Sequence, residues 1–361
     1  MFNYSKMSLN MFPRSFSLSA LSAFVLFGVS ACGSGGGNLS GAGASFPNAI
    51  YTRWFQEIGQ VKGVNVAYQS IGSGAGVQQF IKRTVDFAAS DIPMKAKEIG
   101  MVKQGVVQVP MTAGAIAVAY HNQNCDLKLT QAQLADVFLG KINNWQQLGC
   151  GAKPIKVVFR SDGSGTTANF TAHLSAISKS WQEGPGQGKS VSWPTGIGAK
   201  GNEGVAAQLG QLDGSISYVE AAYVKKPLQA AALTNASGVL VKPTAESEID
   251  GLAAIDLGAD LTGSNPNPAK GYPIVTFTWV LLYKTGNGDN LKSLQTAFDY
   301  ALSDKAQQQA PGLGYVSLPP AVVNKAKLAV ASIQKQLIFL LSCLSGSELF
   351  GGNPDCWIAV I

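Results

Sequence analysis

Short runs of apolar residues alternate along this chain with segments in which apolar residues recur every three or four positions. The first pattern is typical of buried strands, and the second is typical of helices that cover a sheet. We expect strands over 64–69, 85–89 and 155–160, and helices over 77–83 and 167–176. This repetition of strand, tight loop and helix predicts an α/β fold with a largely parallel sheet.

Two apolar stretches are longer than the others. Residues 106–120 and 272–284 are rich in Val, Ile, Thr and aromatic side chains, as long strands are. We interpret them as two crossover strands that form a hinge, with residues 38–112 and 277–335 in lobe one and 113–276 in lobe two. The alternative is that both are central strands of a single domain.

The two ends of the chain differ from its middle. Residues 1–31 contain basic but no acidic side chains and an apolar run too short to cross a membrane, as export signals do. The segment before Cys32 matches a bacterial lipoprotein cleavage site, and the glycines of 32–37 would form a flexible tether. We predict a periplasmic or cell-envelope protein with lipid on Cys32; an ordinary signal peptide with an incidental cysteine is the alternative.

Residues 336–361 form an atypical tail after a helix expected over 321–335, and they fit an extra strand, a membrane-surface contact or a frameshifted end.

Charge and cysteine content narrow the function classes. The formal net charge of +6 is a mild excess, and no dense block of Lys and Arg interleaves with aromatic residues, so we expect no nucleic-acid partner. Cys125 and Cys150 lie in one region, where they are either a disulfide of an oxidising compartment or two buried thiols. The sequence contains no CxxC motif and no Cys/His cluster, so we predict no metal site. It also contains no cofactor motif.

Three segments of small and hydroxyl-bearing residues lie between the predicted elements, at 41–47, 72–76 and 160–166. Each is expected to lead into a helix. A helix start offers unpaired backbone N–H groups and the positive end of a dipole, both of which favour anions. Three such segments together with an arginine predict a site for a small oxyanion.

The third segment carries the strongest chemistry. Arg160 ends a predicted strand, and a guanidinium fork matches a tetrahedral oxyanion in a bidentate way. Asp162 would orient that fork, while Ser164, Gly165 and Thr166 would add hydroxyl and backbone donors. The alternative is that Ser164 only caps the helix and that Arg160 and Asp162 form a surface pair.

The other two segments offer hydroxyls of the same kind. Ser45 and Phe46 precede a proline, which favours a helix start, so Ser45 either caps that helix or presents its hydroxyl and N–H to an anion. Phe46 would line the pocket and contribute its backbone N–H. Ser73 lies in a glycine-rich turn, which either binds an anion or has no ligand.

Asp91 discriminates between anions. It follows a predicted strand, where a ligand would lie, and a carboxylate repels an anion unless that anion carries a proton. Phosphate near neutral pH keeps a proton and sulfate does not, so Asp91 would favour phosphate. The alternative is that Asp91 caps the helix after Ile92 and Pro93.

With these residues in place, the chain resembles the periplasmic phosphate-binding proteins of bacterial phosphate ABC transporters. The resemblance runs from about Leu39 to Lys335, and it does not include the tail. It rests on motifs at 41–47, 71–74, 85–91, 139–142 before Trp145, 162–166, 198–202 and 215–220.

The resemblance implies a two-lobed class II solute-binding fold that closes around inorganic phosphate and delivers it to transmembrane permease subunits, without a cofactor. Asp162 would pair with Arg160, and Ser45 stands where many members have threonine. The implied phosphate contacts are Ala44, Ser45, Phe46, Ser73, Asp91, Arg160, Ser164, Gly165 and Thr166.

Two other functions compete with transport. A phosphatase would use Ser45, Ser73 or Ser164 as nucleophile, but no base or metal cluster is predicted near them. The only histidines, His121 and His173, fall outside the three segments. We therefore do not expect an enzyme. A phosphate sensor or surface adhesin on the same scaffold is the third reading.

Overall fold

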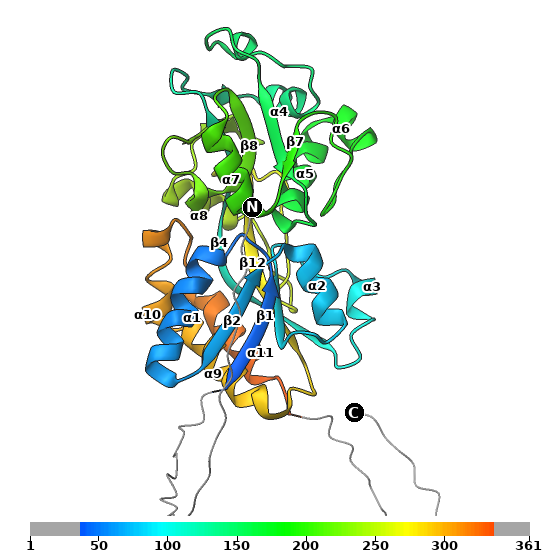
Figure 1. Cartoon of the computed structure of the whole chain (residues 1–361), viewed down its shortest axis with the longest axis vertical. Coiled ribbons are helices and arrows are strands. Elements are labelled where there is room, and N and C mark those ends of the chain that lie inside the picture. The colour runs from blue at the N-terminus through cyan, green and yellow to red at the C-terminus, as the bar shows by residue number, and fades with distance from the viewer. Residues whose placement is uncertain (1–36, 336–361) are drawn as a thin grey trace, which may run out of the picture. The chain divides into compact units, whose positions relative to one another are not determined.

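We describe the fold from a computed structural model, in which residues 37–335 are described (Figure 1). The predictions for the signal segment, Cys32 and the tail 336–361 lie outside these residues. The first elements are β1 (Asn38–Gly43), α1 (Asn48–Lys62), β2 (Asn65–Ser70), α2 (Ser73–Ile81) and β3 (Phe87–Ser90). β1 pairs in parallel with both β2 and β3, so the carboxyl ends of the three strands meet at one edge of the sheet.

The two long strands are present. They are β4 (Val106–His121) and β12 (Val275–Tyr283). β12 runs antiparallel to β3 and to the first part of β4, while the second part of β4 pairs antiparallel with β8 (Ser215–Glu220). The sheet order is β2-β1-β3-β12-β4-β8-β6-β7, so β12 and β4 lie between two groups of strands (Figure 1).

The second group of strands repeats the parallel arrangement of the first. It contains β6 (Lys156–Arg160), α5 (Gly165–Ile177), β7 (Ile197–Ala199) and α7 (Gly201–Gln211). β6 pairs in parallel with β7 and β8. The expectation of a largely parallel sheet is therefore correct within each group but wrong for the centre, because β4 and β12 pass between the groups in opposite directions.

The remaining elements extend and cover this frame. A small sheet has the order β11-β10-β5, and β9 pairs with β4. The strands are β5 (Lys128–Leu129), β9 (Gln229–Ala230), β10 (Ala232–Thr234) and β11 (Leu240–Val241). The helices are α3 (Ala96–Ile99), α4 (Gln131–Phe138), α6 (Lys179–Glu183), α8 (Ala245–Leu252), α9 (Leu291–Ala301), α10 (Asp304–Gln307) and α11 (Pro320–Ala331), with 3-10 turns η1 (Trp145–Leu148), η2 (Ala221–Tyr223), η3 (Gly288–Asn290) and η4 (Pro311–Leu313).

Helix starts differ from the sequence expectation at the two glycine-rich segments. The sequence predicts a loop over 72–76, but only Gly72 turns, with a φ of 88°, and α2 already begins at Ser73. The N–H groups of Ile71 and Gly72 both donate to Gly43 O, which makes this turn abrupt. α5 likewise begins at Gly165, earlier than expected, and α11 ends before the predicted limit.

Aromatic side chains fill the core of each group of strands. Phe87 packs edge-on against Phe298 with ring centres 5.0 Å apart, and Phe170 stacks on Tyr218 at 4.3 Å.

Cys125 and Cys150 form a disulfide, with Cα atoms 5.4 Å apart, which settles the alternative left open by the sequence. Within residues 37–335, no helix is both long and apolar enough to cross a bilayer.

Backbone-to-backbone packing of α2 on β1 yields a stability prediction. A Cβ on Gly76 would lie 2.4 Å from Gly43 Cα and 2.7 Å from Ala42 O, and neither backbone atom can move away without distorting β1. We expect Gly76→Ala to lower the free energy of unfolding by about 1–3 kcal/mol in urea titrations. Gly210→Ala in α7 is the matched control, because a Cβ there meets nothing within 4 Å. Equal stabilities of the two variants would contradict this packing.

Candidate functional site

The three predicted segments and Asp91 meet in one place. Ser73 Oγ, at the start of α2, accepts the N–H of Gly165 at 3.1 Å and lies 3.4 Å from Asp91 Oδ2. On the other side, Asn202 Nδ2 lies 3.0 Å from Ser45 Oγ and 3.3 Å from Thr166 Oγ1. Residues from five parts of the chain therefore surround one small volume, at the carboxyl ends of β1, β3 and β6 and at the starts of α2 and α7.

The predicted contacts are buried in this conformation. Asp91 is 1% exposed and Arg160 is 3% exposed, while Asp162 is half-buried. The others that are buried are Ala44, Ser45, Phe46, Ser73, Ser164, Gly165 and Thr166. Such burial is unusual for charged groups unless they are paired, so the partners of Arg160 and Asp91 are informative.

Arg160 and Asp162 form a two-pronged pair. Arg160 Nε lies 2.8 Å from Asp162 Oδ1, and Nη2 lies 2.5 Å from Oδ2. Burial opposes the charge on Arg160, but the hydrogen bonds and charge of Asp162 outweigh it and raise the pKa of Arg160. The alternative of a surface pair is therefore wrong. Arg160 Nη1 points to Thr166 Oγ1 at 3.4 Å, toward the common volume.

Asp91 is held by donors from two directions. Thr278 Oγ1 on β12 donates to Oδ1 at 2.9 Å, and Ser73 Oγ approaches Oδ2. Burial raises the pKa of Asp91 to about 7, although Thr278 and the charge of Arg160 act against that shift. The alternative of a helix cap is wrong, because Lys95 and Glu98 cap the following helix α3.

The serines divide between capping and pocket roles. Ser164 is the N-cap of α5, since its Oγ accepts the N–H of Thr167 at 3.0 Å, and its backbone turns the chain into the site. Ser45 does not cap α1, whose N-cap is Pro47. The Ser45 hydroxyl instead contacts Asn202, which sequence reasoning missed because it treated the 198–202 motif as family evidence only.

Tyrosine hydroxyls hold the first loop from behind. The hydroxyl of Tyr68 donates to Ala44 O at 2.7 Å, that of Tyr223 donates to Ser45 O at 2.8 Å, and that of Tyr315 donates to Phe46 O at 2.8 Å. The C=O and the following N–H of a trans peptide point in opposite directions. Fixing the first two carbonyls therefore aims the N–H groups of Ser45 and Phe46 away from the tyrosines. No local sequence signal identifies these partners, which lie far apart in the chain.

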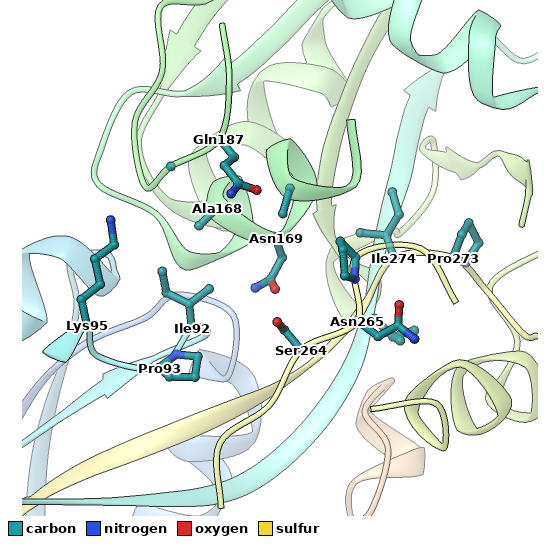
Figure 2. Close-up of a pocket in the computed structure, with 14 residues that line it drawn as sticks. Ile92, Pro93, Lys95, Ala168, Asn169, Gln187, Ser264, Asn265, Pro273 and Ile274 are labelled. Carbon is teal, nitrogen blue, oxygen red and sulfur yellow. The ribbon is translucent and has the colours of Figure 1, made fainter. Parts of the chain in front are cut away.

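A cavity of about 380 Å³ lies beside this site (Figure 2). Ile92, Pro93 and Asn169 are among its walls, and Asn169 Nδ2 donates to Asp91 O at 2.7 Å and to Gly165 O at 3.0 Å. The lining residues, all within 37–335, include none of the predicted anion contacts. This cavity and the anion site are thus neighbours that share a wall.

The described residues offer no site for a metal ion. No group of three or more His, Cys, Asp or Glu side chains within 37–335 has the arrangement to hold one. His121 Nδ1 lies 3.1 Å from Leu209 O, and His173 Nδ1 lies 2.7 Å from Pro266 O, so both rings are engaged with backbone carbonyls.

Comparison with known proteins agrees with this geometry. A sequence profile described as the PBP superfamily domain matches residues 28–305. The phosphate-binding protein PstS of Pasteurella multocida is 40% identical over 321 residues, covering 83% of this chain and 92% of that protein. PstS of Haemophilus influenzae is 41% identical over 310 residues, covering 80% and 91%.

A solved structure shows the same fold. The high-affinity periplasmic phosphate-binding protein PfluDING, bound with phosphate, superposes with a TM-score of 0.68 at 22% identity, covering 81% of this chain and 93% of that one. The expected two-lobed α/β fold is thereby confirmed. The sequence profile and the relatives at about 40% identity show that the chain belongs to the PstS family of phosphate-binding proteins within the PBP superfamily.

Proposed function

We propose that this protein binds inorganic phosphate between its lobes and delivers it to the transmembrane permease subunits of a phosphate ABC transporter. The observation that carries the proposal is the meeting of one buried acceptor, Asp91, and one buried cation, Arg160, on either side of the Thr166 hydroxyl. The names of the PstS relatives support the choice of phosphate.

The arrangement suits a tetrahedral anion that retains one proton. The Arg160 fork and the starts of α2 and α5 supply positive potential and N–H donors. Asp91 supplies an acceptor, which needs a proton on the ligand. Hydrogen phosphate offers that proton, whereas sulfate would place oxygen lone pairs against a carboxylate in a dry site, at a cost of on the order of 1–3 kcal/mol or more.

Closure of the lobes would complete the site. We assign 38–112 and 277–335 to lobe one and 113–276 to lobe two, with β4 and β12 as the hinge. In the present conformation Gly74 N donates to Gly163 O at 2.8 Å and Ser70 Oγ donates to Glu203 Oε1 at 2.7 Å, both across that boundary. A ligand that touches both sides stabilises the closed state relative to the open one.

Binding without turnover fits the surroundings of the serines. The side chains of His121 and His173 are engaged elsewhere, so neither is placed to activate Ser45, Ser73 or Ser164 as a general base would. We further propose that the protein is exported to the periplasm, where PfluDING is also found, and that a lipid on Cys32 keeps it at the membrane near its permease.

Titration calorimetry tests the function directly. We expect purified protein lacking residues 1–32 to bind phosphate and arsenate with 1:1 stoichiometry and to bind sulfate far more weakly. A chromogenic phosphate ester should stay intact in its presence. Absence of phosphate binding would refute the proposal, and turnover of the ester would replace it with the phosphatase reading.

Replacement of the acceptor should change selectivity. In Asp91→Asn the amide can donate to a fully deprotonated oxygen, so the preference for phosphate over sulfate is expected to fall by at least about tenfold. Competition titrations at neutral pH measure this ratio. Asp86→Asn, outside the predicted site, is the control for loss of one carboxylate, and an unchanged ratio in Asp91→Asn would remove Asp91 from the anion site.

The buried carboxyls should make the empty protein less stable as pH rises. Burial raises the pKa of Asp91 and of Glu248 to about 7, so between about pH 4 and 7 the folded chain holds protons that the unfolded chain has lost. These two carboxyls therefore lower the stability through this range, by about 1.4 kcal/mol for each unit of raised pKa, while burial lowers the pKa of His173 to about 4 and so acts in the opposite direction. Urea unfolding in phosphate-free buffer at about pH 5, 6 and 7.5 measures the slope. The stability of Asp91→Asn should fall less with rising pH than that of the wild type, and an equal pH dependence of the two proteins would contradict the assignment.

A further inference from the structure

The hydroxyl of Ser45 has little freedom in this structure. A hydroxyl has one proton to donate and two lone pairs that accept. The backbone N–H and the Nδ2 of Asn202 both donate to Ser45 Oγ, each at 3.0 Å. Both lone pairs are then occupied, and the proton is the only hydrogen-bonding capacity that Ser45 has left.

The orientation of the Asn202 amide follows from its other end. The N–H of Glu220, at the end of β8, donates to Asn202 Oδ1 at 3.1 Å. A reversed amide would place an NH2 group against that N–H. The Nδ2 group must therefore face the hydroxyls, and Asn202, which is fully buried, has no room to turn.

The hydroxyl of Thr166 is constrained in the same way. Its Oγ1 lies 3.3 Å from Asn202 Nδ2 and 3.4 Å from Arg160 Nη1, and both of these groups can only donate. Thr166 is therefore also left with its proton. Two hydroxyls from distant parts of the chain, one after β1 and one in α5, thus share Asn202 Nδ2 as a donor, with the Asn202 N–H and Arg160 Nη1 as the second donors.

We propose that Asn202 is a positioning residue that sets the protonation state of the anion the site accepts. It does not touch the anion. By occupying the lone pairs of Ser45 and Thr166, it forces both hydroxyls to donate, so the oxygens facing them must carry no proton. Asp91 is then an acceptor that neither of these hydroxyls can replace, and the preferred guest is a tetrahedral dianion with one proton. This inference rests on the proposed phosphate binding.

Two substitutions of Asn202 distinguish control of the ligand's protonation state from a purely structural contact between the lobes. Asn202→Asp keeps the shape but presents a carboxylate oxygen, to which Ser45 and Thr166 would donate, leaving lone pairs toward the ligand. We expect its Kd for phosphate to exceed the wild-type Kd by about 100-fold at about pH 8, where the dianion dominates. At about pH 5.5, where the monoanion dominates, the ratio should shrink at least about fivefold.

Several charged or titratable groups surround these hydroxyls, namely Arg160, Asp162, Asp91, Glu203, Glu220 and Tyr223. All of them are retained in the variants, so we compare the ratio of variant to wild-type Kd at each pH. Asn65→Asp, at an exposed position on β2, controls for the added charge. Asn202→Ala is the second variant in case Asn202→Asp does not fold; it frees one lone pair on each hydroxyl and should weaken binding about tenfold at pH 8 and less at pH 5.5.

The outcomes are distinct. A loss that is larger at pH 8 than at pH 5.5 in the neutral variant Asn202→Ala supports the proposal, because the carboxylate of Asn202→Asp also repels the dianion more strongly than the monoanion. An equal loss of phosphate affinity at both pH values overturns the proposal and leaves Asn202 as a structural link only. No loss of affinity overturns it as well. If wild-type protein binds no phosphate in the same titration, the proposed function itself has failed rather than the role of Asn202.

Discussion

A carboxylate and a guanidinium share one dry volume in this protein, and the rest of the architecture serves that arrangement. Asp91 and Arg160 are both almost completely buried. Neither could be buried alone without a large loss of hydration energy, so each brings partners: Thr278 and Ser73 for the acid, Asp162 for the base. Because these five residues come from four different parts of the chain, the site exists only when the whole sheet has formed.

The sheet explains how those parts meet. Within each group of strands the parallel pairing brings the carboxyl ends to one edge, where the loops after β1, β3 and β6 begin. The antiparallel centre, β4 and β12, then places the two edges face to face. Thr278 serves both purposes, because it lies on β12, which joins the two groups of strands, and its hydroxyl donates to Asp91.

How much was predictable depended on the range of the interaction. Glycine-rich segments with nearby hydroxyls and Arg160 are local signals of a helix start, so the segments that form the site can be predicted from the sequence. Both long strands can be predicted as well. The antiparallel centre was missed because strand direction depends on where the chain goes next, not on its apolar pattern. Thr278 was missed because a threonine within an apolar strand has no distinguishing signal. Asn202 and the three tyrosines were missed because each acts on a loop more than twenty residues away.

The tyrosines behind the first loop have a consequence for the order of events. Tyr68 and Tyr315 come from the same proposed lobe as the loop they hold, whereas Tyr223 comes from the other lobe. Separation of the lobes would release the Ser45 carbonyl alone. In an open state the N–H of Ser45 would thus already be aimed, while that of Phe46 would be aimed only as the lobes come together. An incoming ion would meet a receptor that is half assembled, and its arrival would finish the assembly.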